Sequence, residues 1–153
     1  PIRKIYNRVS YPFLKGHYNL LNKDYGVVRM EKIETEKAPK AIGPYSQAVK
    51  VNNLVFTAGQ IALNPKTNQM VEGDIVVHAA QIFKNIQSIL EAAGTSLDNA
   101  IKVNVYLKDM NDFQKMNEIY EKYIKNKPAR ATIQAAALPK NALVEIDVIA
   151  EVN

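Results

Sequence analysis

The stretch IKVNVYLK, residues 101–108, alternates strictly between apolar and polar side chains. An alternation with a period of two residues is typical of a β-strand that buries one face and exposes the other. The residues expected on the buried face are Ile101, Val103, Val105 and Leu107. This segment therefore predicts one strand of a sheet that is covered on a single side.

A helix is predicted on each side of this strand. Before it, apolar residues recur at intervals of three and four over residues 76–93, with Asp74 as the expected N-cap and Gly94 at the end. After it, a second apolar stripe begins at Asp112 and ends before Pro128, which cannot continue a helix.

Short strands are predicted at both ends of the chain, over residues 31–35, 48–51, 54–60, 131–135 and 144–152. Strands followed by helix, strand, helix and strands predict an α+β domain whose mixed sheet carries both helices on one face. The last strand places Glu145 and Asp147 on its other face. That second face is expected to meet either water or another copy of the chain.

Composition narrows the possible functions. A chain of 153 residues with 47% apolar content fits one domain. The absence of cysteine excludes disulfides, a thiolate nucleophile and cysteine-based metal sites. The two histidines, His17 and His78, lack the spacing of a metal site, so no metal is expected. No apolar run reaches about 18 residues, so we expect a cytoplasmic protein without a membrane partner.

Residues 1–29 differ from the predicted domain of residues 30–153. They hold six basic side chains against one acidic side chain, which accounts for the whole net charge of +5. The remaining residues are neutral, which makes a nucleic-acid partner unexpected. The extension is either a targeting leader, a docking arm or non-native sequence, and a native leader would favour a mitochondrial or other organellar location.

Four polar residues stand where neither a core nor a strand end requires them: Tyr45, Asn117, Arg130 and Glu145. Arg130 follows Pro128-Ala129 at the mouth of a predicted strand and is either solvated or a planar fork for a small carboxylate. Glu145 is either solvated or, if a subunit covers its face, a half-buried carboxylate that holds water or relays a proton.

Five segments of the chain resemble the RidA family, which is also called YjgF or reactive intermediate imine deaminase. These segments are APKAIGPYSQAV (38–49), TAGQI (57–61), KVNVYLKDMNDFQKMNEIY (102–120), KPARATI (127–133) and LPKNALVEIDVIA (138–150). The resemblance extends from about residue 33 to residue 152. It implies a chorismate-mutase-like α+β fold and a homotrimer, whose sheets form a barrel with active sites between subunits.

The resemblance also implies a chemistry. Family members hydrolyse reactive enamines and imines, such as 2-aminoacrylate and 2-iminobutanoate, to 2-oxo acids and ammonia without a cofactor. Arg130 would bind the substrate carboxylate and Glu145 would orient the attacking water. Tyr45 and Asn117 would line the cleft, and the backbone of Gly59 would approach the ligand.

Three positions depart from the pattern of bacterial family members. Ala58 replaces a serine, Thr132 replaces a cysteine and Gln134 replaces a glutamate. Because Ala58 and Thr132 occupy site positions of the family, both remain candidates for substrate binding. The resemblance therefore leaves the preferred imine open.

Two other functions remain as alternatives to the deaminase. One is an endoribonuclease or translation inhibitor, against which the neutral domain and the lack of a histidine pair argue. The other is a non-catalytic trimer that binds small carboxylates or other proteins. Because a fold hosts many functions, the fold alone does not separate these hypotheses.

Overall fold

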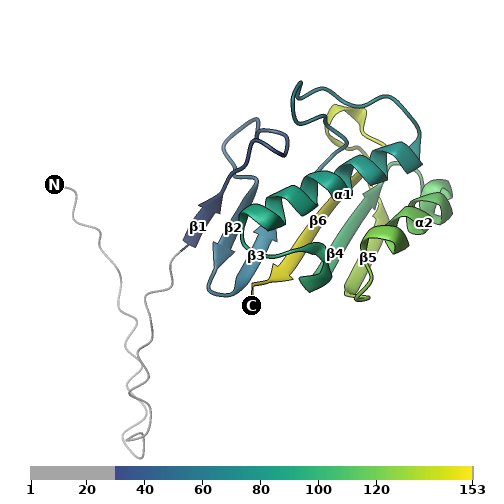
Figure 1. Cartoon of the computed structure of the whole chain (residues 1–153). Coiled ribbons are helices and arrows are strands. Elements are labelled where there is room, and N and C mark those ends of the chain that lie inside the picture. The colour runs from purple at the N-terminus through teal and green to yellow at the C-terminus, as the bar shows by residue number, and fades with distance from the viewer. Residues whose placement is uncertain (1–29, 153) are drawn as a thin grey trace, which may run out of the picture.

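One six-stranded sheet carries both α-helices on the same face in the computed structural model, which describes residues 30–152 (Figure 1). The strands are β1 (Met30–Ile33), β2 (Ala48–Val51), β3 (Leu54–Thr57), β4 (Ala100–Leu107), β5 (Ala129–Gln134) and β6 (Val144–Glu151). The helices are α1 (Ile75–Ala92) and α2 (Phe113–Tyr123). The predictions for residues 1–29 lie outside the described residues, and the domain boundary at residue 30 stays a prediction.

The sheet is mixed, as predicted. Its strand order is β1-β2-β3-β6-β4-β5, and β5 pairs with β4 in parallel while every other neighbouring pair is antiparallel. The helix α2 connects β4 to β5, and parallel neighbours need such a crossover. The α+β class with two helices on one face is therefore confirmed.

The helix α1 begins where the sequence predicts. The side chain of Asp74 accepts hydrogen bonds from the backbone N–H groups of Val76 and Val77, which confirms it as the N-cap. The buried stripe of α1 packs over the middle of the sheet, where it meets the inward residues of β6. The largest buried residues of this stripe are Ile75, Ile82, Phe83, Ile86, Ile89 and Leu90.

The prediction for Ile101 is wrong. A register shift between Ala100 and Lys102 in the β4·β6 ladder adds one residue to β4, which turns the alternation over at this point. Ile101 is 45% exposed and Ala100 occupies the inward position instead. The inward orientation of Val103, Val105 and Leu107 is confirmed, because all three are buried.

The strand β3 is shorter than predicted, because the chain bulges out of the sheet after Thr57. Phe56 pairs with Ile149 and Gln60 pairs with Ile146, so this side of the ladder holds one residue more than β6. The Thr57 hydroxyl accepts the N–H of Val148 at 2.9 Å and so replaces one ladder bond. We call residues 58–59 the β3 bulge.

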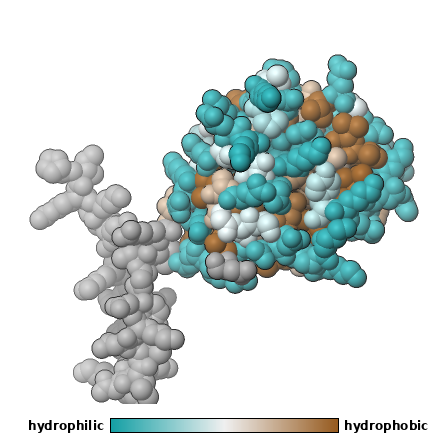
Figure 2. Space-filling model, viewed as in Figure 1, coloured by the Kyte–Doolittle hydropathy of each residue, from teal (hydrophilic) through white to brown (hydrophobic). Residues whose placement is uncertain are grey.

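The outer side of the helix layer is mainly hydrophilic, with hydrophobic side chains showing between the polar ones (Figure 2). The opposite face of the sheet mixes polar residues such as Asn104 and Asp147 with Phe56 and Ile133, which are 38% and 52% exposed. Covering of this face by further copies, as in the expected trimeric barrel, stays a prediction. Neither helix in residues 30–152 has the length and hydropathy that a membrane span requires.

Candidate active site

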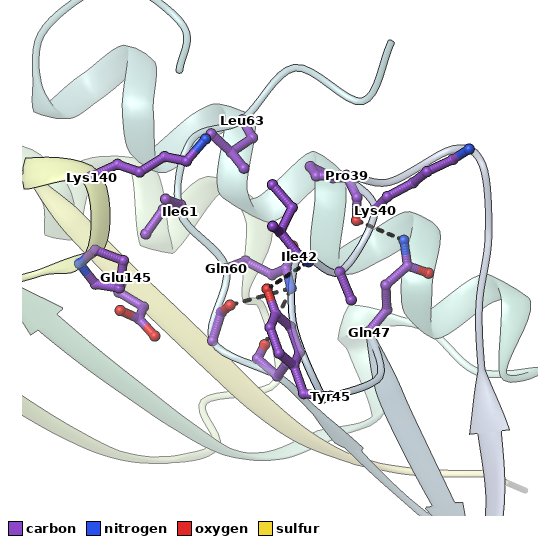
Figure 3. Close-up of a pocket in the computed structure, with 14 residues that line it drawn as sticks. Pro39, Lys40, Ile42, Tyr45, Gln47, Gln60, Ile61, Leu63, Lys140 and Glu145 are labelled. Carbon is purple, nitrogen blue, oxygen red and sulfur yellow. Dashed lines mark hydrogen bonds between the residues drawn. The ribbon is translucent and has the colours of Figure 1, made fainter. Parts of the chain in front are cut away.

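Four of the predicted site residues line one cavity of about 460 Å³: Tyr45, Ala58, Gly59 and Glu145. Its walls come from the loop before β2, the β3 bulge and the turn before β6. In Figure 3, Glu145 and Tyr45 approach the same opening from different sides, with Gln60 behind it. The structure thus brings these four residues together, although they are up to 100 positions apart in the chain.

The β3 bulge fixes the position of the Glu145 side chain. Glu145 lies on the polar face of β6, because its neighbours Val144 and Ile146 are fully buried on the helix side. A Cβ atom on Gly59 would overlap Glu145 Oε1 and lie 2.8 Å from its Cδ. A side chain at position 59 would therefore displace the Glu145 carboxylate, which rests against the backbone there.

This contact predicts the effect of Gly59→Ala. The added methyl group displaces the Glu145 carboxylate, and we expect kcat for the proposed reaction to fall roughly tenfold or more. The free energy of unfolding should change by only about 1 kcal/mol, because the displaced atoms end a flexible side chain. Steady-state kinetics and thermal melts measure the two effects.

Gly94→Ala is the matched control for this prediction. Gly94 follows α1 with φ of +84°, so alanine there strains the backbone far from the cavity. We expect lower stability and unchanged kcat for this variant. Equal kcat values for the two variants would contradict the contact between Gly59 and Glu145.

The surroundings of Glu145 shift the pKa of its carboxyl group. Burial raises its pKa above the ordinary value, and the charge of Asp147 two residues along the same face raises it further. Asp147 is itself held by Asn104, whose Nδ2 donates to Asp147 Oδ1 at 2.8 Å. A carboxylate with a raised pKa can take up a proton from a bound water molecule and return it.

The raised pKa of Glu145 predicts how stability depends on pH. Protonation is easier in the folded than in the unfolded chain, so this group's contribution to stability is complete below the unfolded pKa and is lost as pH rises through the folded pKa. Glu145→Gln cannot ionise, so we expect it to melt at a higher temperature than the wild type at about pH 7. The difference should vanish towards about pH 4.

An exposed glutamate provides the control for this experiment. Glu118→Gln on α2 also removes one negative charge, but from a solvated side chain. A melting difference that has the same pH dependence in both variants would exclude burial of Glu145 as its cause.

Tyr45 stands at the mouth of the cavity on a loop that has little freedom. Its hydroxyl accepts the N–H of Ile42 at 3.3 Å, and its own N–H donates to the carbonyl of Gly43, whose φ of +135° suits glycine. The Tyr45 side chain remains 54% exposed. Its ring can therefore cover a ligand without first leaving a buried position.

Gln47, which sequence reasoning missed, anchors this loop. It is buried, its Nε2 donates to the carbonyl of Pro39 at 2.7 Å, and its Oε1 accepts the N–H of Thr35 at 2.6 Å. The available signal was a glutamine at the entrance of a strand whose other residues are mainly apolar. A buried amide in that place must satisfy backbone groups.

Arg130 belongs to a separate part of the structure. It is the second residue of β5 rather than preceding the strand, because parallel pairing with β4 already starts at Ala129. Its Nη1 donates to Asn117 Oδ1 at 2.7 Å, so the predicted residues Asn117 and Arg130 are in direct contact. Both line a hollow beside the C-terminal half of α2.

Thr132 and Gln134 follow Arg130 on the same face of β5. The Thr132 hydroxyl is buried and has no hydrogen-bond partner among residues 30–152. Gln134 Oε1 accepts the N–H of Met110 at 2.8 Å and so fixes the segment that precedes α2. This contact does not explain the change from glutamate, because a carboxylate oxygen would accept the same N–H.

Arg130 and Glu145 lie on opposite faces of the sheet. Glu145 pairs with Tyr106 on the open face, whereas Arg130 pairs with the buried Val103 on the helix side. The cavity around Glu145 and the hollow around Arg130 share no lining residue. The predicted site residues therefore form two separate clusters in one protomer, which we call half-sites, and the predicted catalytic pair does not meet within it.

Comparison with known proteins places the chain in a family. The family model described as endoribonuclease L-PSP matches residues 35–152. The chain belongs to this family, which is also called RidA or YjgF. The matched range covers both half-sites.

Close relatives are known for this RidA family chain. A RutC family protein of Pyrococcus horikoshii is 57% identical over 121 residues, which cover 78% of this chain and 96% of that protein. The human 2-iminobutanoate/2-iminopropanoate deaminase is 50% identical over 119 residues, which cover 77% and 87%. The solved structure of E. coli TdcF with bound serine has a TM-score of 0.76 at 38% identity, covering 80% of this chain and 99% of that one.

The described residues offer no cluster for a metal ion. Within residues 30–152, no three histidine, cysteine, aspartate or glutamate side chains gather closely enough to ligate one. The groups that line the two half-sites are the Arg130 guanidinium, lysine ammonium groups, the carboxylates of Glu145 and Glu121, amides, hydroxyls and backbone N–H groups.

Proposed function

We propose that the protein hydrolyses reactive enamines and imines, such as 2-aminoacrylate and 2-iminobutanoate, to 2-oxo acids and ammonia. The observation that carries this proposal is the Arg130 guanidinium, which is held in place and leaves most of its donors for a ligand. These substrates are small carboxylates, which match a planar fork of N–H donors. The deaminase name of human and mouse relatives at 50% identity supports the same reaction.

Arg130 binds the substrate in this proposal. A guanidinium has five N–H donors, and within residues 30–152 Arg130 uses one hydrogen bond, to Asn117. Two parallel bonds from the remaining donors fix both the position and the plane of a carboxylate. The reacting carbon, which is bonded directly to that carboxylate, is then held in a defined place.

Glu145 acts as the general base for the attacking water in this proposal. Its carboxylate accepts a proton from a water molecule as the water oxygen adds to the imine carbon, which gives a carbinolamine. The proton then passes to the nitrogen. As the C–N bond breaks and ammonia leaves, the hydroxyl oxygen forms the C=O bond of the 2-oxo acid and its proton returns to the Glu145 carboxylate. The raised pKa of Glu145 makes its carboxylate a stronger base for the uptake of this proton. Binding and proton transfer at these residues require no further group.

We further propose that each site forms between two protomers of a homotrimer. The half-site of Arg130 and the half-site of Glu145 lie on opposite faces of the sheet, so a neighbouring copy must supply the missing half. The open face, with its exposed Phe56 and Ile133, supplies the surface for packing between protomers. This assembly accounts for the polar residues at the centre of that face.

A non-catalytic binder is the second candidate, because one similar structure holds serine, a small amino-acid carboxylate. A ribonuclease has less support: the described residues contain a single histidine, His78, which is buried with its Nε2 against the carbonyl of Val71. No histidine of residues 30–152 therefore stands beside Glu145 as a general base.

The deciding experiment adds purified protein to a threonine dehydratase that generates 2-iminobutanoate, and follows release of 2-oxobutanoate and ammonia. Faster release supports the deaminase. Binding of 2-oxobutanoate without faster release identifies a binder, and cleavage of RNA by protein free of contaminating nuclease overturns the proposal in favour of a ribonuclease.

A further inference from the structure

We propose that Tyr120 is a positioning residue, whose ring holds the Arg130 guanidinium in the orientation that receives the substrate carboxylate. This inference rests on the proposed function for its kinetic consequence. The structural part of the inference is that one face of α2 fixes the guanidinium, and this part does not depend on the reaction.

The contacts around Arg130 come from one stripe of α2. Phe113, Asn117 and Tyr120 are spaced by four and three residues and therefore project from the same side of the helix. The guanidinium carbon Cζ of Arg130 lies 4.6 Å from the ring centroid of Tyr120 and 5.5 Å from that of Phe113. Both distances are within the range at which a cation is attracted to an aromatic ring.

The Tyr120 ring cannot move away from this contact easily. It is only 7% exposed, and the ring of Phe83 on α1 meets it edge to face, with centroids 5.8 Å apart. Aromatic pairs favour this edge-to-face arrangement. The core of the protein thus fixes the surface against which Arg130 rests.

The ring of Tyr120, rather than its hydroxyl, serves this purpose. The hydroxyl oxygen is buried and has no hydrogen-bond partner among residues 30–152. It therefore neither fixes the guanidinium nor reaches the surface of the hollow. A phenylalanine in this place would retain the contact with Arg130.

Asn117 fixes the edge of the same guanidinium. Its Nδ2 donates to Glu121 Oε1 at 3.1 Å, which orients the amide so that Oδ1 faces Arg130. One edge of Arg130 is then bound by an amide and one face covered by a ring. The other N–H donors of the guanidinium remain free to bind a carboxylate. Because the guanidinium is already oriented, it loses less entropy when it binds the ligand.

The test compares three variants in the coupled deaminase assay. Tyr120→Leu removes the ring, and we expect KM to rise about tenfold while kcat changes little. Tyr120→Phe should restore KM to within about twofold of the wild type. Tyr123→Leu is the matched control. Tyr123 also packs on Phe83, with ring centroids 5.2 Å apart, but the rings that lie under the Arg130 guanidinium in residues 30–152 are those of Phe113 and Tyr120.

A merely structural role for Tyr120 would give a different pattern. Tyr120→Leu and Tyr123→Leu would then lower the melting temperature together and leave KM unchanged, or raise KM by the same factor. Either result overturns the inference. A rise in KM that is confined to Tyr120→Leu and reversed by phenylalanine supports it.

A second readout separates this inference from the proposed function. The side-chain Nε–H signal of Arg130, followed by NMR in protein labelled with ¹⁵N, reports the ring contact without any turnover. Tyr120→Leu should shift this signal and speed its exchange with water, whereas Tyr123→Leu should not. If the wild-type protein releases no 2-oxo acid but the two variants show this NMR pattern, the deaminase is refuted and the positioning role of Tyr120 is retained. If the Arg130 signal is unshifted in Tyr120→Leu, the positioning role is refuted.

Discussion

We expect Arg130→Ala to lower kcat/KM for the proposed hydrolysis of 2-iminobutanoate by at least about a hundredfold. Two hydrogen bonds between charged partners are worth about 3 kcal/mol or more, and each 1.4 kcal/mol is a factor of ten. Alanine removes every donor that the carboxylate would use, while Asn117 remains next to an empty space. The coupled dehydratase assay measures the loss.

Arg130→Lys is the informative companion. Lysine keeps the charge but presents a single ammonium group instead of a planar fork, and it also loses the stacking contacts on Phe113 and Tyr120. We expect an activity between those of alanine and arginine, with KM most affected. Wild-type activity in correctly folded Arg130→Ala protein would remove Arg130 from the site.

We expect that mixing two inactive variants restores activity, if the proposed site between protomers is correct. Arg130→Ala protein keeps Glu145, and Glu145→Gln protein keeps Arg130, so a proposed trimer that contains both would form a complete site across one interface. Random assembly of equal amounts gives complete sites at about a quarter of the interfaces. Co-expression with two different affinity tags, followed by purification of the mixed trimers, provides the sample for the assay. In these purified mixed trimers about a third of the interfaces are complete.

The double variant Arg130→Ala/Glu145→Gln, mixed equally with wild type, is the control. If each site combines two protomers, both must be wild type, so about a quarter of the sites remain. If one protomer held the whole site, about half would remain. No recovery in the first mixture and half-activity in the second would together exclude a site between protomers.

Patterns that repeat along the chain predict most of the fold. The stripe of α1, its cap at Asp74 and the alternation of β6 depend on neighbours within a few residues, and the structure confirms them. The inward position predicted for Ile101 fails, because the register shift at Ala100 is determined by pairing with β6, about 50 positions away. Local alternation contains no information about such a shift.

The sequence predicts only some of the residues of the candidate site, for a similar reason. Arg130 and Glu145 stand out as charged residues in apolar strands, and the family resemblance assigns them roles that stay predictions. Gln47 and Tyr120 were missed as contributors, because each acts through contacts made only in three dimensions. Tyr120 belongs to the apolar stripe of the second predicted helix, but its spacing alone does not distinguish a core residue from one that supports an arginine.

The β3 bulge interrupts the pairing of β3 with β6 and forms part of the cavity wall. A strand that continued in register from Phe56 to Gln60 would extend the ladder with β6 and close the gap beside Glu145. Removing a single residue from this segment would thus favour a longer, more regular sheet while destroying the wall of the cavity. The length of this segment therefore affects stability and activity in opposite directions.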